Sequence, residues 1–284
     1  LLLVPFFGTE IKGSKRWIDL IILPRIQPIE FVKPFLVVVI SLIICSQKLT
    51  NLNLKYLLSF IIIFFVSIFL IIQPDIGQTL LTGLTWLILI FVSGINLFFL
   101  MSIFLVSISG LLLMIFFIER FEYIKNRLFS FINPEAGTYN FQSNKALESI
   151  KSGGFFGKGI GEGTLKNQVP EAHTDYIISV ISEEFGVILI MIILLIFLIF
   201  IISVLKKVHY ENNEKIKLIL TGSISLILIQ VMIHIGVNIR LFPTTGMTLP
   251  FLSYGGSSLI GSAFIAGIIL NFTRKDSIRY FKNE

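Results

Sequence analysis

The chain has 284 residues, of which 55% are hydrophobic and only 14% carry a charge. With a mean hydropathy of +0.89, this composition excludes an ordinary soluble domain and indicates an integral membrane protein. The formal charge of +6 does not predict a nucleic-acid partner, because no basic stripe alternates with aromatic residues on a polar face. The single cysteine, Cys45, lies inside an apolar run, so no disulfide framework is expected.

Apolar runs long enough to cross a bilayer recur along the chain and predict an all-α, polytopic membrane protein formed by a helical bundle. Seven complete spans are expected, near residues 31–46, 56–73, 76–94, 96–118, 180–205, 216–238 and 251–273. Residues 1–7 resemble the end of an earlier span. Since the chain does not begin with Met, we expect a sequence truncated at its N-terminus, with residues 1–284 forming one membrane domain.

Lys and Arg are unevenly distributed between the two sides of these spans. The loops after the first, third and fifth spans, together with the C-terminal tail, carry more of them than the short loops on the opposite side. Because cytoplasmic loops are enriched in positive charge, the C-terminus is predicted to be cytoplasmic. The long segment 119–175 is then an external loop, and its aromatic residues predict that it folds onto the membrane surface.

A polar motif, Gln27-Pro28-Ile29-Glu30-Phe31-Val32-Lys33-Pro34, opens the first complete span. Glu30 and Lys33 are spaced i, i+3 and share one helix face, where they can neutralise each other. The motif predicts a buried polar cavity, with an ordinary interfacial ion pair as the alternative. Arg16 and Trp17, just before it, suit an interfacial anchor.

The turn between the next two spans contains Asp75, which is well placed to cap the following helix. Further along, residues 153–163 are rich in glycine, but they do not form a phosphate-binding P-loop. The required spacing before Gly-Lys is one residue short, and Gly159 follows Lys158 where Ser or Thr is needed. We expect instead a backbone that closely approaches a substrate head group.

Three ionisable side chains crowd the segment Val169-Pro170-Glu171-Ala172-His173-Thr174-Asp175, where the long loop re-enters the membrane. Polar groups beside hydrocarbon are costly, so this cluster is a functional-site hypothesis. The alternatives are a metal triad, or a helix start capped by Thr174 or Asp175, with Glu183 or Glu184 at the interface.

The last span follows a segment rich in small residues, 242–258, that permits close helix approach. His234, Asn238 and Arg240 are expected to approach the same external end as this segment.

Together these motifs resemble the SEDS family (shape, elongation, division and sporulation). The motifs that carry the resemblance occur in the family's order: Lys15-Arg16-Trp17-Ile18, Gln27-Pro28-x-Glu30-x-x-Lys33, Gln73-Pro74-Asp75-x-Gly77, Ser152-Gly153-Gly154-x-x-Gly157, Pro170-Glu171-x-His173-Thr174-Asp175 and Ser253-Tyr254-Gly255-Gly256-Ser257-Ser258. Residues 161–166 and 243–250 look more like the division branch than the elongation branch. Departures are small, such as Tyr176 where Phe is usual.

The resemblance implies a fold of ten helices, so about three N-terminal helices would be absent here. It also implies a peptidoglycan glycosyltransferase that acts on lipid II at the outer face of the bacterial cytoplasmic membrane, at the division septum. Its implied partners are a class B penicillin-binding transpeptidase and other divisome membrane proteins. The alternatives are a lipid II flippase and an elongation-type polymerase.

Asp175 stands at the family's catalytic position and is the expected general base. The expected substrate-binding residues are Lys33, Glu30, Arg16, Lys166, Glu171, His173 and Ser253. Lys33 is expected within about 4 Å of Asp175, the usual limit of an ion pair. The leaving diphosphate would be stabilised by Arg16, by Lys166 or by a divalent cation such as Mg²⁺ or Mn²⁺; no metal-binding residues are predicted.

Overall fold

The computed structural model of the protein describes residues 1–2, 4–11, 14–19, 25–49, 51–117, 121–132 and 139–274. The chain divides into two compact units. Unit 1 comprises Leu1–Ser93, Ile196–Val231 and Pro250–Glu284, and unit 2 comprises Gly94–Leu195 and Met232–Leu249. The prediction of a single domain stays a prediction.

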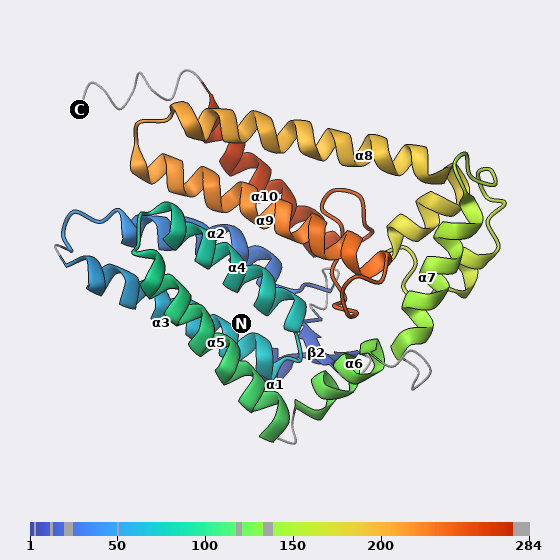
Figure 1. Ribbon diagram of the computed structural model, residues 1–284, viewed down its shortest axis with the longest axis horizontal. Coiled ribbons are helices and arrows are strands. Elements are labelled where there is room, and N and C mark those ends of the chain that lie inside the picture. Colours follow the sequence, from blue (N-terminus) through green and yellow to red (C-terminus); the bar gives the residue numbers. More distant parts are fainter. Residues whose placement is uncertain are drawn as a thin grey trace. The chain divides into compact units, whose positions relative to one another are not determined.

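Unit 1 begins with a short helix and a hairpin and continues with helices (Figure 1). Its elements are α1 (Val4–Phe7), β1 (Thr9–Ile11), β2 (Ser14–Trp17), α2 (Pro28–Ile44), α3 (Leu52–Ile72), α4 (Ile76–Val92) and α10 (Gly256–Thr273), with parts of α8 (Ile177–Tyr210) and α9 (Glu214–Asn238). The two strands pair antiparallel, with Glu10 opposite Lys15. This hairpin, together with an isolated antiparallel bridge between Ile18 and Ile26, departs from the predicted all-α composition.

Unit 2 holds α5 (Leu97–Phe117), α6 (Glu122–Ile132), α7 (Tyr139–Gly153), the 3-10 helix η2 (Leu165–Gln168), the first part of α8 and the end of α9. The segment 119–175, predicted as a loop, is therefore largely helical where it is described. The sequence of α7 is polar and contains no long apolar run, so it did not predict a helix here.

Each of the seven predicted spans is a helix, which confirms the polytopic helical fold. Within the described residues, α3, α8, α9 and α10 are long and apolar enough to cross a membrane by length and composition. Pro28 occupies the first turn of α2, where its missing N–H breaks no helical hydrogen bond. The last helix begins at Gly256, later than predicted, because residues 250–255 form turns.

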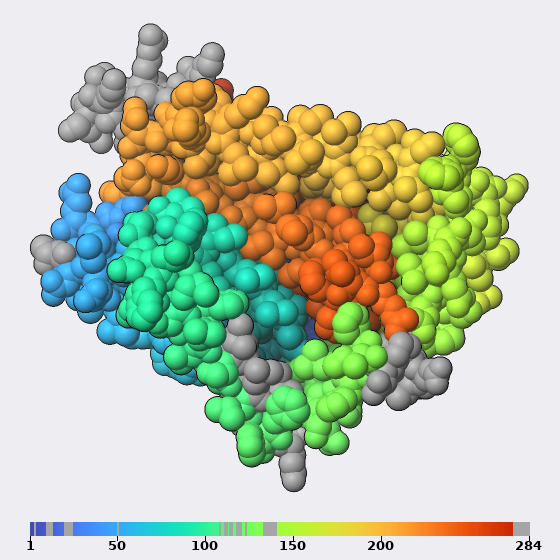
Figure 2. All heavy atoms as spheres, in the orientation of Figure 1, coloured from blue at the N-terminus to red at the C-terminus, as the bar shows by residue number. Residues whose placement is uncertain are grey.

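Helices α9 and α8 differ in how far they are covered by protein. The most apolar window of α9 is 83% buried, whereas that of α8 is only 22% buried. A Cβ at Gly222 of α9 would lie 2.6 Å from Val37 Cγ1 and 3.0 Å from Leu89 Cδ2, so glycine lets α9 approach α2 and α4 closely. Apolar side chains of α8 remain uncovered along its length (Figure 2), as expected for a lipid-facing helix.

Candidate functional site

A buried ion pair stands at the start of α2 in unit 1. Lys33 Nζ lies 2.8 Å from Glu30 Oε2, and the two side chains are 1% and 3% exposed. The remaining polar atoms of the pair are also engaged. Lys33 Nζ donates to Gln230 Oε1 at 3.3 Å, and Gln78 Nε2 donates to Glu30 Oε1 at 2.6 Å. The structure thus brings Glu30 and Lys33 together in a buried polar cluster rather than at an exposed interface.

The network continues from Gln78 to Asp75 at the start of α4. Asp75 Oδ1 accepts a hydrogen bond from Gln78 N at 3.3 Å, which confirms the predicted helix cap. Gln27 Nε2 donates to the other carboxylate oxygen at 3.0 Å. Burial raises the pKa of the Asp75 carboxyl, and the Arg16 guanidinium, with Nη1 3.7 Å away, opposes that rise.

Arg16 is held by the turn between α3 and α4. Its Nε donates to Gln73 O at 3.3 Å, and its Nη2 donates to Pro74 O. The guanidinium therefore ties β2 to this turn, in addition to its ion pair with Asp75. These contacts give Arg16 a structural role, and its predicted role at a diphosphate stays a prediction.

Ser253, the fourth predicted site residue of unit 1, is buried in the turn region before α10. Gln78 and Gln230 belong to the same unit and were missed by sequence reasoning. The sequence did offer a signal for both residues. Each is a glutamine within an apolar helix, and a polar side chain in a membrane needs a hydrogen-bond partner.

In unit 2, the segment that carries Asp175 folds into successive turns before α8. The carbonyl oxygen of Glu171 accepts hydrogen bonds from the amides of Thr174, Asp175 and Tyr176 at 3.1, 3.1 and 3.3 Å. Glu171 itself has a φ of 59°, a left-handed conformation that is uncommon outside glycine. Such conformations persist where the surrounding structure enforces them, often at functional sites.

The end of α9 fixes the Asp175 backbone. Asn238 Nδ2 donates to Asp175 O at 3.1 Å and to His234 O at 2.9 Å, and Asn238 is fully buried. His234, Asn238 and Arg240 were predicted to approach the same end as segment 242–258, and His234 Nδ1 does lie 2.8 Å from Met247 O in that segment. The buried Asn238 amide holds the carbonyl of the candidate base, so the position of Asp175 is set from two elements.

The side chains of this segment differ in exposure. Glu171 and His173 are exposed, and Asp175 is half-buried. Tyr176 is buried, and burial together with the neighbouring Asp175 charge raises the pKa of its phenol, while Arg127 opposes that rise. Glu171 Oε2 accepts a hydrogen bond from Thr174 Oγ1 at 3.1 Å.

A second carboxylate, Glu183 in the first part of α8, organises the loop upstream of Asp175. Its side chain is fully buried and accepts five hydrogen bonds, from 2.7 to 3.2 Å. The donors are Ser149 Oγ, Lys158 Nζ and the backbone amides of Thr164, Leu165 and Lys166. These hydrogen bonds tie the loop to α8, and the alternative that Glu183 or Glu184 lies at the membrane interface stays a prediction. The Lys166 ammonium pairs with Glu184.

Helix α8 is interrupted at Gly186, where φ is 81° and ψ is 175°. The break frees backbone groups that the loop then uses. Lys158 N and Gly159 N donate to the carbonyls of Glu183 and Glu184 at 2.8 and 3.0 Å. A Cβ at Gly157 would overlap the carbonyl of Glu184. The predicted close backbone approach therefore occurs, but the neighbour in the structure is α8.

The predicted residues fall into two sets, one in each unit. Unit 1 contains Arg16, Glu30, Lys33 and Ser253, and unit 2 contains Lys166, Glu171, His173 and Asp175. The pairing of Lys33 with Asp175 would join the two units and stays a prediction. Among the residues that the structure describes, no group of three or more His, Cys, Asp or Glu could hold a metal ion.

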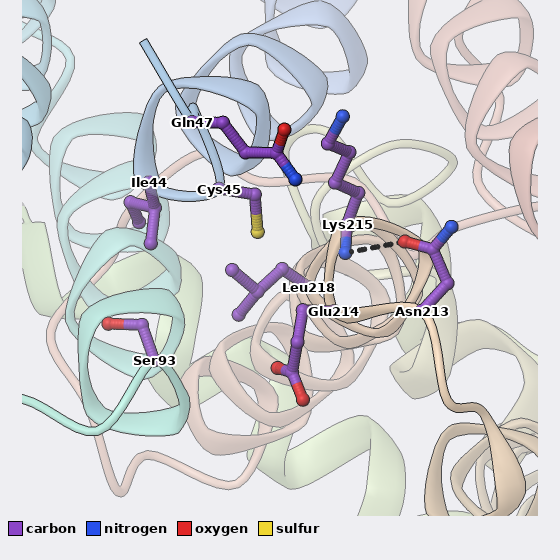
Figure 3. Close-up of a pocket in the computed structure, with 8 residues that line it drawn as sticks. All are labelled: Ile44, Cys45, Gln47, Ser93, Asn213, Glu214, Lys215 and Leu218. Carbon is purple, nitrogen blue, oxygen red and sulfur yellow. Dashed lines mark hydrogen bonds between the residues drawn. The ribbon is translucent and has the colours of Figure 1, made fainter. Parts of the chain in front are cut away.

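Unit 1 also contains a cavity of about 370 Å³ near the start of α9 (Figure 3). It is lined by Ile44, Cys45, Gln47, Ser93, Asn213, Glu214, Lys215 and Leu218. Asn213 Oδ1 accepts a hydrogen bond from Lys215 N at 3.0 Å and so caps α9. None of the predicted site residues lines this cavity.

The fold and these sites define an integral membrane protein of several helices, with buried charges near helix starts and a carboxylate held just before a membrane-crossing helix. The chain belongs to the cell cycle protein family of FtsW, RodA and SpoVE, whose family model matches residues 1–278.

Curated relatives and solved structures agree with that membership. The chain is 33% identical over 275 residues to the probable peptidoglycan glycosyltransferase FtsW of Caulobacter vibrioides, covering 97% of this chain and 69% of the relative. It is 33% identical to the stage V sporulation protein E of Bacillus subtilis, covering 96% and 75%.

Among solved structures, the rod-shape-determining protein RodA of Thermus thermophilus matches with a TM-score of 0.66 and 25% identity, covering 96% of this chain and 73% of that one. A chain of a peptidoglycan synthase complex that couples polymerisation and crosslinking matches with a TM-score of 0.75, covering 96% and 77%. At 24% identity, this second likeness bears on the fold alone.

Proposed function

We propose that this chain is a peptidoglycan glycosyltransferase that polymerises lipid II into glycan strands during cell division. The observation that carries the proposal is the half-buried Asp175, whose backbone is held by Glu171 and Asn238 immediately before α8. Membership of the family supports it, as do relatives named as probable peptidoglycan glycosyltransferases, including one from Francisella salina at 36% identity over 94% of this chain and 68% of its own.

The reaction joins two lipid-linked sugars. The 4-hydroxyl oxygen of one sugar attacks C1 of the other, and its proton passes to the Asp175 carboxylate as general base. The bond from C1 to the diphosphate oxygen breaks, and undecaprenyl diphosphate leaves with the electron pair. One base on the attacking side and cationic groups on the leaving side suffice for inversion at C1.

Lys166, in the same unit as Asp175, is the proposed cation for the diphosphate, with Arg16 or a divalent cation as the alternatives. Its ammonium is paired with Glu184. A bound diphosphate would therefore compete with, or add to, this carboxylate. Lys33, held by Glu30, stays the proposed partner of the base. Glu171, His173 and Ser253 complete the proposed substrate-binding set.

The distribution of buried charge favours an enzyme over a lipid II flippase. The buried Asp, Glu and Lys side chains of the described residues are Glu30, Lys33, Asp75 and Glu183, and each lies at or within two turns of a helix start. Transport across the bilayer would need polar groups through its full thickness. Charges confined to helix starts suit chemistry at a membrane face.

The setting of the reaction belongs to the same proposal. We place the site on the external face of the cytoplasmic membrane at the septum, with a class B penicillin-binding transpeptidase and other divisome proteins as partners. A chain of a peptidoglycan synthase complex that couples polymerisation and crosslinking has the same fold. An elongation-type role is the alternative branch.

The test is a lipid II polymerisation assay with the purified chain and its transpeptidase. Asp175→Asn removes the base but keeps the side-chain shape, so polymer formation should fall by about 10²-fold or more. The matched control is Glu162→Gln, which neutralises an exposed carboxylate of the same loop and should leave the rate unchanged. Wild-type polymer from Asp175→Asn would refute the proposal. Replacing Mg²⁺ with EDTA in parallel tests the divalent cation.

A further inference from the structure

Three large apolar side chains stand exposed on the glycine-rich segment after α7. Phe155, Phe156 and Ile160 are 73%, 84% and 78% exposed. All three belong to unit 2, within a short stretch whose polar and glycine residues leave them uncovered. Exposed apolar side chains that gather in one place usually mark a surface for another apolar body.

Backbone hydrogen bonds fix this segment against the break in α8. Val187 N donates to Gly154 O at 3.0 Å, and Ile188 N donates to Phe155 O at 3.4 Å. On the other side of Gly186, the carbonyls of Glu183 and Glu184 accept from Lys158 and Gly159. Figure 1 shows α7 and this segment beside the start of α8. The backbone of this segment therefore lies at the level of Gly186.

The same level coincides with one end of the apolar part of α8. Residues Val187 to Leu205 are apolar except for Ser203, and Lys206 and Lys207 follow directly. At about 1.5 Å per residue this stretch measures ~28 Å, close to the ~30 Å thickness of a bilayer's hydrocarbon core. One end of this apolar stretch therefore lies at Gly186, at the level of the backbone that carries Phe155 and Phe156.

We propose that Phe155, Phe156 and Ile160 form a wedge that inserts into the lipid bilayer beside α8, at the boundary between head groups and acyl chains. Aromatic side chains favour this zone. The glycine backbone of the segment meets α8 through hydrogen bonds, so it leaves few unpaired amides at the membrane surface.

The wedge has a consequence for the depth of the site, and this step rests on the proposed function. Glu183 binds both Lys158, inside the glycine-rich segment, and the amides of residues 164–166, shortly before Pro170–Asp175. The buried Glu183 carboxylate thus links the wedge to the loop segment that leads to Asp175, the proposed base. The wedge fixes the height at which Asp175 meets a lipid-linked head group.

The test measures depth and needs no catalytic activity, so it stays separate from the test of the proposed function. Cys45→Ser removes the native thiol, and a nitroxide label is attached to Phe156→Cys in full-length protein in phosphatidylglycerol and phosphatidylethanolamine nanodiscs. Depth is read from how often the nitroxide collides with two paramagnetic reagents. Oxygen concentrates in the bilayer, whereas the polar reagent NiEDDA stays in water. Leu195→Cys on the exposed face of α8 gives the deep reference, and Glu162→Cys on the same loop gives the aqueous reference.

We expect the label at 156 to collide more with oxygen than with NiEDDA, between the two references. Labels at Phe155→Cys and Ile160→Cys should give the same shift. If the label at 156 matches Glu162→Cys, the wedge lies in water and the proposal is overturned. A label shielded from both reagents would place the segment against protein, which also overturns it.

Discussion

At the scale of single residues, the pair of Lys33 and Glu30 illustrates why a buried charge needs all of its partners. The two charged groups lie 2.8 Å apart where almost no water reaches them, and Gln78 and Gln230 satisfy the atoms that the pair leaves over. A buried pair of this kind is weak evidence for net stability, because desolvation offsets much of the attraction. Removing one partner is different, since the remaining charge then has no compensation.

Lys33→Met should therefore destabilise the protein by about 3–5 kcal/mol, the usual cost of leaving one buried charge unpaired. The measurement is thermal unfolding in detergent, monitored by the fluorescence of a dye that does not react with thiols. The matched variant is Lys33→Met combined with Glu30→Gln, which removes both charges and should recover much of the lost stability. A double variant no more stable than Lys33→Met alone would show that the pair does not act in this way.

Sequence reasoning reached one half of this network. The i, i+3 spacing predicted the pairing of Glu30 with Lys33, and the turn before α4 predicted the cap by Asp75. Gln230 could not be assigned, because it lies 197 positions from Lys33 in the chain. Contacts across such a separation are made by helix packing, which local pattern does not specify.

At the scale of elements, the break in α8 also depends on contacts between distant residues, which local sequence pattern does not specify. The sequence around Gly186 predicts a span beginning near residue 180, and its position was close to the helix found. The break itself is stabilised by the loop, whose amides bond to the carbonyls of Glu183 and Glu184. A helix interrupted by tertiary hydrogen bonds leaves no local signal beyond a single glycine. The same loop was predicted to approach a substrate head group closely, and these bonds show a close approach to α8.

Gly157 and Gly161 are a matched pair of positions for testing the hydrogen-bonded contact between this loop and α8. They have φ values of 80° and 81°, so alanine would strain both backbones equally. A Cβ at Gly157 would overlap the Glu184 carbonyl, whereas a Cβ at Gly161 would meet nothing within 4 Å. Gly157→Ala should thus cost about 1–3 kcal/mol more than Gly161→Ala, the range for overpacking.

Two measurements check this prediction. Thermal unfolding gives the difference in stability, and hydrogen exchange reports the amides of Lys158 and Gly159, which should exchange faster in Gly157→Ala. Equal behaviour of the two variants would mean that the close approach to α8 is not required. The overlap of a Cβ at Gly157 with the Glu184 carbonyl makes stability the property that this substitution should change first.

At the scale of the whole molecule, composition and span pattern are enough to predict a polytopic helical membrane protein, since the requirement for internal backbone hydrogen bonding leaves few options in lipid. The hairpin of β1 and β2 was not predicted, because Thr9–Ile11 is too short to show an alternating pattern. Similarly, α7 is polar enough to read as a loop. What the sequence could indicate was which residues are costly in a membrane, and Asp175, Glu30 and Lys33 were found that way.

The orientation of the chain in the membrane is the remaining whole-molecule prediction. The excess of Lys and Arg in the loops after the first, third and fifth spans predicts that residues 211–213 face the cytoplasm and that the glycine-rich segment faces outward. Both Asn212 and Glu162 are exposed, so a cysteine at either position can react. In the Cys45→Ser background, a membrane-impermeant maleimide added to intact cells should label Glu162→Cys at once. It should label Asn212→Cys only after the membrane is permeabilised. The reverse pattern would place Asp175 on the cytoplasmic side, where a polymerase of external lipid II could not work.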